Sequence, residues 1–367
     1  MSGPRRGRLL PSMLLLLVSV LVTLGALELA FRAARVPVGT VQINRATVRR
    51  SPNPRLRFDL RPGAVAAAEV EYRVNTSGLR GPEVGEAKPA GVTRVAVLGD
   101  SIAFGYWVAE EDAFPRQLER LLNAGPAARR VEVLNFGVPG YNLDQTTEVL
   151  RSRVLRFAPD AVVLALCLND LESALSYEYG LTVDRSARRQ SVAGRVADAL
   201  LEHSRLFAWI EYRLAEREGR RAFVRTRNPM PGPLYAEAVS QQQAELQARF
   251  DVLAVLLREA GGVPGLVAVF PTFGERFDRY PHRDLHRAVM AAARRASLAA
   301  VDLLDCFAAY DFRAARVDVV HPSPLGHRVA AHAIHEALCA AGLPCPAPPR
   351  GRCTDYRPRD FAVVRGY

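Results

Sequence analysis

The chain has 367 residues, 49% of them hydrophobic, which is enough for one large domain or two small ones. Its formal net charge is +11 at pH 7, and every basic residue except Lys88 is an arginine. These arginines are scattered, and no basic run alternates with aromatic residues, so the sequence argues against nucleic-acid binding. An anionic membrane surface is a partner that fits this charge better.

An apolar stretch of 19 residues runs from Met13 to Phe31, with Glu28 as the one charge inside it. At about 1.5 Å per residue, a helix of this length nearly crosses a hydrocarbon core of about 30 Å. The stretch is long for a signal peptide, and three arginines before it favour a cytoplasmic N-terminus. We therefore predict a cytoplasmic tail at 1–8 and a transmembrane anchor at 9–31, with a cleaved signal peptide as the alternative.

Beyond residue 90, short apolar runs typical of strands alternate with segments typical of helices. Such a βαβ series forms a parallel sheet with helices on both faces. We predict an α/β fold, a flavodoxin-like three-layer α/β/α sandwich around a parallel five-stranded sheet. The predicted strands lie at about 94–98, 131–135, 161–166, 266–270 and 300–304, and the predicted helices near 114–123, 143–157, 284–299 and 324–338.

The third and fourth predicted strands are separated by residues 171–262, far too many for a plain connection. Helices are predicted there from Leu200 to Arg217 and from about Tyr235 to Glu259, with a Pro-rich loop between them. The sequence leaves two interpretations open: an inserted helical cap, or helices that only cover a face of the sheet.

Ser101 follows the first predicted strand, in the tripeptide Gly99-Asp100-Ser101, where a helix would begin. A turn at this point exposes the serine hydroxyl, and the first N–H groups of the helix point toward an oxyanion that forms beside it. The same three residues are common in ordinary turns. The tripeptide alone therefore does not decide between a nucleophile and a simple turn.

Gly137 and Asn169 follow the second and third predicted strands. Gly137 can offer a backbone N–H with no side chain in the way, and Asn169 can donate its amide to a developing oxyanion. A plain loop and a helix-capping asparagine are the alternatives. Ligands of doubly wound sheets bind beyond the carboxyl ends of the strands, which is where Ser101, Gly137 and Asn169 all fall.

Asp318 and His321 lie three residues apart near the C-terminus. A carboxylate at this spacing can fold back and accept from the imidazole Nδ1–H, which leaves Nε2 free to take a proton from a serine. Ser323 and Pro324 mark the start of a final helix, so the histidine is held on a short loop. A surface aspartate and a surface histidine would give the same spacing.

Taken in order, these four motifs resemble those of the SGNH, or GDSL, hydrolase family over about residues 91–340. The resemblance implies that Ser101 is the nucleophile and that His321 and Asp318 complete a catalytic triad. It also implies that the N–H groups of Ser101 and Gly137 and the side chain of Asn169 form the oxyanion hole. The third motif usually reads Gly-x-Asn-Asp, and here Cys167 replaces the glycine; we interpret Cys167 as a small buried apolar residue.

The segment from Tyr72 to Gly81 resembles the one that precedes the catalytic motif in membrane-anchored bacterial members of this family, and the sequence offers no mechanism for it. Together with the cytoplasmic N-terminus favoured above, this resemblance leads us to expect a single-pass protein of the bacterial inner (cell) membrane with its catalytic domain on the extracytoplasmic side. Beyond the anchor we therefore expect a stalk and lead-in segment at 32–90, a hydrolase domain at 91–345 and a C-terminal tail at 346–367.

The cysteines and the remaining histidines complete the candidate residues. Cys306 falls near a predicted core strand, and two of the three C-terminal cysteines can close a small loop in an oxidising compartment. His282 and His286 have the i, i+4 spacing of a metal pair, but no third ligand suggests itself, so we predict a solvated helix start. Surface positions are predicted for His327, His332 and His335. The sequence contains neither a dinucleotide fingerprint nor a P-loop, so neither a cofactor nor a metal is expected.

These expectations describe a membrane-anchored serine esterase that hydrolyses a small-molecule, lipid or glycan ester through an acyl-enzyme. An O-acyltransferase or deacetylase acting on an envelope polysaccharide would use the same machinery, because only the group that meets the acyl-enzyme differs. A non-catalytic envelope scaffold that retains the fold is the third possibility. The sequence identifies no protein partner.

Overall fold

The computed structural model describes residues 9–34, 36, 47–67, 70–124, 130–171, 233–274, 276–345 and 352–354, with short pieces between 192 and 214. The chain divides into two compact units. The first comprises Met1–Ala46 and Asp184–Arg227, and the second comprises Thr47–Val183 and Asn228–Tyr367. The unit that contains the sheet therefore begins at residue 47, whereas the sequence led us to begin the hydrolase domain at 91.

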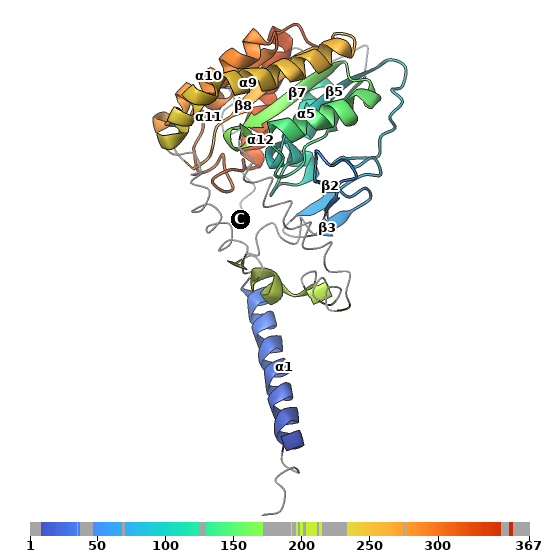
Figure 1. The fold of residues 1–367 in the computed structure, drawn as a ribbon, viewed down its shortest axis with the longest axis vertical. Helices are drawn as coiled ribbons and strands as arrows, with labels where there is room; N and C mark the ends of the chain where they lie inside the picture. Colours follow the sequence, from blue (N-terminus) through green and yellow to red (C-terminus); the bar gives the residue numbers. More distant parts are fainter. Residues whose placement is uncertain are drawn as a thin grey trace, which may run out of the picture. The chain divides into compact units, whose positions relative to one another are not determined.

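A five-stranded parallel sheet forms the centre of the second unit, in the order β6-β5-β7-β8-β9 (Figure 1). This is a doubly wound order, in which the winding of the chain reverses between β5 and β7. All five predicted strands are found, and the predicted α/β fold is confirmed. The strands are β5 (Val92–Leu98), β6 (Arg130–Asn135), β7 (Ala161–Cys167), β8 (Gly265–Phe270) and β9 (Ala299–Asp302).

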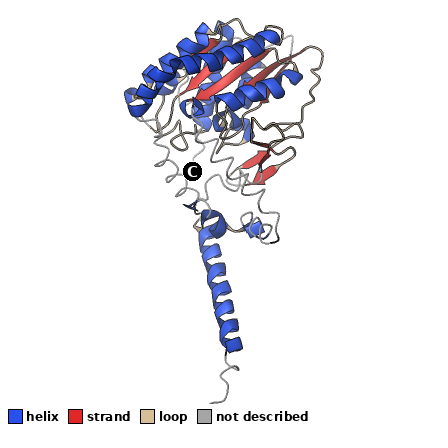
Figure 2. Ribbon diagram, in the orientation of Figure 1, coloured by secondary structure: helices blue, strands red, loops and turns tan. Residues whose placement is uncertain are grey.

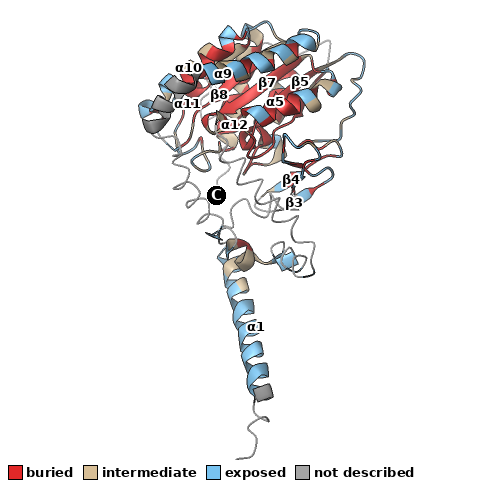
Figure 3. Ribbon diagram, viewed as in Figure 1, coloured by how far each residue is buried: buried red, intermediate tan, exposed pale blue. Residues whose placement is uncertain are grey.

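Helices cover both faces of this sheet (Figure 2). On one face α9 (Pro233–Glu259) packs between α5 (Leu143–Ser152) and α10 (Arg283–Arg295), and on the other α4 (Phe114–Leu122) packs against α12 (Pro324–Ala340). The central strand β7 is buried along its whole length, whereas the edge strand β9 is only partly buried (Figure 3). Because α9 buries Phe250, Leu253 and Leu257, the second half of the predicted insertion covers the sheet rather than forming a cap.

Two small antiparallel sheets precede the sandwich. In the first, β1 (Val48–Arg50) pairs with β2 (Phe58–Leu60), and in the second, β3 (Val65–Ala67) pairs with β4 (Glu71–Arg73). The phenol of Tyr141 donates a hydrogen bond of 2.6 Å to the carbonyl of Phe58, which ties the first of these sheets to the turn before α5. Much of the expected lead-in is therefore part of the body of the second unit.

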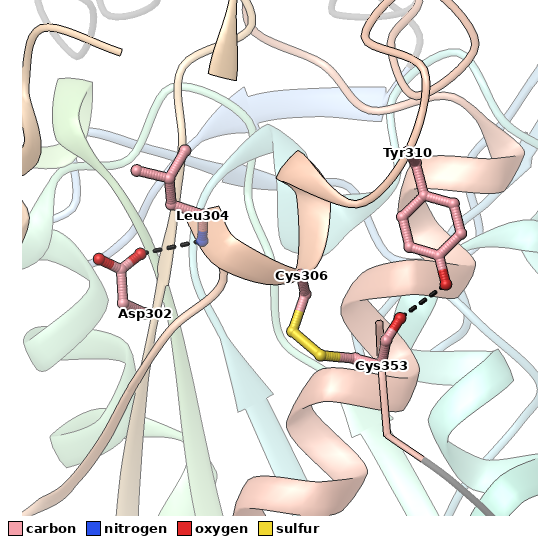
Figure 4. Close-up of a disulfide and its surroundings, with 5 residues drawn as sticks. All are labelled: Asp302, Leu304, Cys306, Tyr310 and Cys353. Atoms are coloured by element: carbon pink, nitrogen blue, oxygen red, sulfur yellow. Dashed lines mark hydrogen bonds between the residues drawn. A yellow bond between two sulfur atoms is a disulfide. The ribbon is translucent and has the colours of Figure 1, made fainter. Parts of the chain in front are cut away.

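Two disulfides lie in the C-terminal part of the chain, Cys306–Cys353 and Cys339–Cys345. Cys306 sits on α11 (Leu304–Ala308), a short helix after β9, and the hydroxyl of Tyr310 donates to the carbonyl of Cys353 at 2.6 Å (Figure 4). Sequence reasoning left Cys306 unpaired, because its partner is 47 residues away. Sulfur atoms of the second disulfide and a ring nitrogen of His335 lie within 4.8 Å of one another, but both sulfurs are already bonded.

Three histidines that we expected on the surface are buried, so that prediction is wrong for them. His286 lies on the buried face of α10, with Nδ1 2.8 Å from Oδ1 of Asp302 and Nε2 3.1 Å from the hydroxyl of Tyr280. His327 and His335 lie on faces of α12 that are covered by neighbouring elements. Helix periodicity shows which residues share a face, but it does not show that α12 is packed on more than one side.

The first unit contains α1 (Leu9–Ala33), and no residue of its most apolar window is buried (Figure 3). Within the described part of the chain, α1 over Pro11–Ala33 is the single helix long and apolar enough to cross a membrane, a property that a signal sequence shares. Glu28 of α1 accepts hydrogen bonds from the hydroxyl of Ser204 and from the N–H groups of Arg205 and Leu206, at 2.8–3.0 Å. The first N–H groups of the helical residues 205–210 are therefore capped by Glu28, near the C-terminal end of α1.

Candidate active site

Ser101 begins α3 (Ser101–Phe104), a one-turn helix directly after β5. Oδ1 of Asp100 accepts the N–H of Ile102 at 2.8 Å and caps this helix. Gly99 has a φ of +150°, and a Cβ at this position would lie 2.6 Å from the carbonyl oxygen of Ala165 in β7. Only glycine permits this turn, which places the serine at the carboxyl end of β5, next to the point where the winding reverses.

Ser101, His321 and Asp318 form a continuous chain of hydrogen bonds. Nε2 of His321 lies 2.9 Å from Oγ of Ser101, and its Nδ1 lies 2.8 Å from Oδ2 of Asp318. Ser101 and His321 are 220 residues apart in the sequence. The fold therefore brings together the three side chains that the sequence motifs singled out, each within hydrogen-bond distance of the next.

The loop that carries Asp318 and His321 is braced on several sides. Oδ1 of Asp318 accepts the N–H groups of Val320 and His321 at 2.8 and 2.7 Å. The N–H of Val317 donates to the carbonyl of His321, and the N–H of Phe273, just beyond β8, donates to the carbonyl of Val319. The imidazole is thus held on a loop fixed at both ends and in the middle.

The ionisation of Asp318 fits this arrangement. Burial alone would raise the pKa of this carboxyl. The hydrogen bond and charge of His321, with the N–H groups of Val320 and His321, outweigh burial and lower the pKa to about 2. Asp318 is therefore a carboxylate at neutral pH, and it can stabilise an imidazolium that forms on His321.

Asn169 lies on the 3-10 turn Leu168–Leu171, directly after β7. Its Nδ2 donates to Oδ2 of Asp100 at 3.2 Å, and the same oxygen lies 3.3 Å from Oγ of Ser101. Asp100 therefore holds the Asn169 amide beside the serine hydroxyl.

Cys167 and Asp170, on either side of Asn169, are both buried. Burial, together with the nearby charges of Asp100 and Asp170, raises the pKa of the Cys167 thiol well above its usual value. Burial and Asp100 likewise raise the pKa of Asp170, whose Oδ2 accepts the N–H of Cys167 at 2.9 Å. Because a thiol rather than a thiolate is present, Cys167 is a poor nucleophile, in agreement with its interpretation as a small buried residue.

Gly137 is in a different environment from the one expected. Its N–H donates to Oδ1 of Asn135 at 2.9 Å, and Nδ2 of Asn135 donates to the carbonyl of Ala103 in α3 at 2.8 Å. A Cβ on Gly137 would lie 2.3 Å from the backbone nitrogen of Phe104. The structure therefore gives Gly137 a packing role against the serine helix, and Asn135 a bridging role that sequence reasoning missed.

Sequence reasoning also missed two aromatic residues that follow α3. The indole Nε1–H of Trp107 donates to Oδ2 of Asp318 at 3.0 Å, and the ring of Tyr106 meets the His321 ring edge-on at 5.6 Å between centroids. No spacing rule predicts these contacts, because Asp318 is 211 residues from Trp107.

Comparisons with known proteins agree with this fold. The model of the GDSL-like lipase/acylhydrolase family matches residues 97–329, which include Ser101, Gly137, Asn169, Asp318 and His321. The match defines a serine hydrolase that acts on ester bonds. More particularly, the chain belongs to the GDSL-like lipase/acylhydrolase family, also called SGNH hydrolases. No curated protein matches the chain.

Several solved structures have a similar arrangement. They include an acetylxylan esterase from Geobacillus stearothermophilus (16% identity, 67% of this chain and 94% of that chain covered, TM-score 0.41). An alpha/beta hydrolase enzyme from the metagenome of Lake Arreo, Spain, has 18% identity, 72% and 97% coverage and a TM-score of 0.42. A lipase/acylhydrolase from Enterococcus faecalis has 16% identity, 71% and 99% coverage and a TM-score of 0.39. These likenesses are distant, so family membership rests on the sequence match.

Proposed function

We propose that this protein is an esterase in which Ser101, His321 and Asp318 act as a catalytic triad on a carboxylic ester. The observation that carries the proposal is the chain of hydrogen bonds from Ser101 Oγ through His321 to the Asp318 carboxylate, at 2.9 and 2.8 Å. In this arrangement the imidazole is oriented by an ionised carboxylate and faces the hydroxyl that it must deprotonate.

The reaction proceeds in two halves. Ser101 Oγ attacks the acyl carbon while its proton moves to Nε2 of His321, and the tetrahedral intermediate collapses when His321 returns that proton to the leaving alcohol. In the second half His321 takes a proton from water, the resulting hydroxide attacks the acyl-enzyme, and the carboxylic acid leaves as Ser101 regains its proton. Asp318 remains a carboxylate throughout and stabilises each imidazolium.

The proposed oxyanion hole consists of the N–H of Ser101, the side-chain amide of Asn169 and the N–H of Gly137. Asn169 is supported by its position next to the serine through Asp100. The N–H of Gly137 already donates to Oδ1 of Asn135. To reach an oxyanion it must share that hydrogen bond or rotate away from Asn135. Each effective donor lowers the barrier by about 3 kcal/mol.

Kinetics on a p-nitrophenyl acetate-type ester test the proposal. Ser101→Ala and His321→Ala are each expected to lower kcat by at least about 10⁴-fold, and the double variant is expected to be little worse, because the two residues act as one unit. Asn169→Ala is expected to lower kcat by about 100- to 1,000-fold with KM nearly unchanged.

The matched control is His203→Ala, which removes an exposed histidine of the first unit. It should retain full activity, and circular dichroism should show that all the variants are folded. Labelling with a serine-directed phosphonate should occur in the wild type and be lost in Ser101→Ala. Wild-type activity in purified Ser101→Ala would overturn the proposed nucleophile and the mechanism with it.

We also propose that α1 is retained as a membrane anchor and that the esterase lies on the extracytoplasmic side of a bacterial inner membrane. Glu28 supports retention, because cleavage after α1 would remove the carboxylate that accepts the N–H groups of Arg205 and Leu206 at the start of a helix. The two disulfides support an oxidising compartment.

A further inference from the structure

The carboxylate of Asp318 accepts four hydrogen bonds. Oδ1 takes two backbone N–H groups of its own loop. Oδ2 takes Nδ1 of His321 at 2.8 Å and the indole Nε1–H of Trp107 at 3.0 Å. A carboxylate has about four lone-pair sites, so the donor from Trp107 completes the set. Trp107 is the one side chain among these donors that comes from the serine side of the site.

Trp107 is held in a conformation that it would not adopt by itself. Its φ is +65°, in the left-handed region that costs a bulky residue energy unless its surroundings impose it. The backbone N–H of Trp107 donates to the hydroxyl of Tyr72 at 2.8 Å. Tyr72 is completely buried on β4, in the segment before the sheet.

Arg80 also fixes this loop. Its guanidinium is buried and donates to the carbonyls of Phe104, Gly105 and Val108, where α3 ends and the loop of Trp107 follows. It also lies over the Tyr72 ring, 4.7 Å from its centroid. Cations at the C-terminal end of a helix satisfy carbonyls that have no partner within the helix.

We propose that Trp107 is a positioning residue for the Asp318–His321 pair, and that the lead-in motif, residues 72–81, holds it in place through Tyr72 and Arg80. The proposal rests on the proposed function, because it assigns Trp107 a role through Asp318. It gives a purpose to the upstream segment for which the sequence offered no mechanism: the motif connects the loop after the nucleophile to the acid of the triad.

The chemical consequence follows from the sharing of Oδ2. With the indole present, the carboxylate cannot rotate away from Nδ1, and part of its negative charge is drawn toward the indole N–H. Without the indole, Oδ2 loses this donor, the orientation of His321 is less fixed, and more of the carboxylate's negative charge faces Nδ1 of His321. Loss of Trp107 is therefore expected to slow turnover and to move the acid limb of the pH–activity profile to higher pH.

The test compares Trp107→Phe with Trp209→Phe, which changes the other tryptophan of the chain in the first unit. On a p-nitrophenyl acetate-type ester, Trp107→Phe is expected to lower kcat about 10-fold with KM within about twofold, since one hydrogen bond to a charged group is lost. The acid limb of the kcat/KM profile should move to higher pH. Trp209→Phe should leave kcat, KM and the acid limb unchanged.

The other groups that face His321 are the same in both variants. Among the described residues they are Asp318 on its own loop, Ser101 and Tyr106 in and after α3, and His327 of α12, whose pKa is lowered by burial and by the charges of Arg80 and His321. A displaced acid limb in Trp107→Phe therefore reports the lost indole, which a purely structural defect would not reproduce.

Tyr72→Phe keeps the proposal testable if Trp107→Phe does not fold. It retains the buried ring and removes only the oxygen that accepts the Trp107 N–H, so kcat should fall about threefold with the acid limb displaced in the same direction. Unchanged kcat and an unchanged acid limb in the folded variants would overturn the positioning role while Ser101→Ala remains inactive. Activity in Ser101→Ala would instead overturn the proposed function itself.

Discussion

His327 shows how a single buried residue ties the stability of this protein to pH. Its ring is completely buried, and Nδ1 accepts the N–H of Phe114 at 3.2 Å. Burial and the charges of Arg80 and His321 lower its pKa to about 3. An unfolded histidine titrates near 6.5, so below that pH the unfolded chain binds a proton that the folded chain refuses. The stabilisation is complete above pH 6.5 and is lost as the pH falls toward 3.

We predict that His327→Asn reduces this acid sensitivity, because asparagine is neutral at every pH and its side-chain oxygen can still accept from Phe114. Between pH 7.5 and pH 5 the wild type should lose about 2 kcal/mol more unfolding free energy than the variant. Urea denaturation at the two pH values measures the difference. His203→Asn, at an exposed site, is the control and should behave as the wild type does; equal acid losses in all three proteins would contradict the prediction.

At the scale of elements, the turn after β6 packs closely against α3. Only glycine fits at position 137 of this turn. A Cβ there would lie 2.3 Å from the Phe104 nitrogen and 2.7 Å from the carbonyl carbon of Ala103. These are backbone atoms of the serine helix, which cannot move without moving Ser101. A substitution at this position therefore displaces Ser101 through packing, even though the N–H group of residue 137 is kept.

We predict that Gly137→Ala lowers both stability and turnover, by a few kcal/mol and at least about 100-fold, because the overlap displaces α3. Thermal unfolding and steady-state kinetics measure the two effects together. Gly85→Ala is the matched control: a Cβ there has open space, so both properties should stay near the wild type. If Gly137→Ala is folded, stable and active, the close contact does not constrain the site.

Some elements of this fold could be predicted from the sequence, and others could not. The five strands were predictable because each is an apolar run bounded by turns, and the motif residues fall at their ends. The short pairs β1–β2 and β3–β4 were not, because strands of three residues carry no periodic signal. The roles of Trp107, Asn135 and Arg80 were equally out of reach, since each depends on contacts that only the folded chain creates.

The molecule as a whole combines a sheet unit that carries the proposed triad with a separate unit built around α1. The length of its apolar run identified α1, but the sequence did not reveal that residues 204–209 contact it. Glu28 accepts two backbone N–H groups from residues 205 and 206, and the ring of Phe31 meets that of Trp209 edge-on at 5.4 Å. These contacts predict two separable effects of removing the N-terminal residues.

We predict that a chain lacking residues 1–36 is soluble and hydrolyses the ester with kcat within about twofold of the full-length protein in detergent, because the triad and sheet belong to the other unit. Its tryptophan emission should shift to the red, since Trp209 loses its contact with Phe31.

The full-length protein should stay with membranes after a carbonate wash and give a mass that still includes α1. A mature protein that begins after α1 would show that the helix is a cleaved signal sequence. A truncated chain that still sediments with membranes would show instead that another surface binds lipid. Lost activity in a soluble, folded truncation would mean that the first unit contributes to the site.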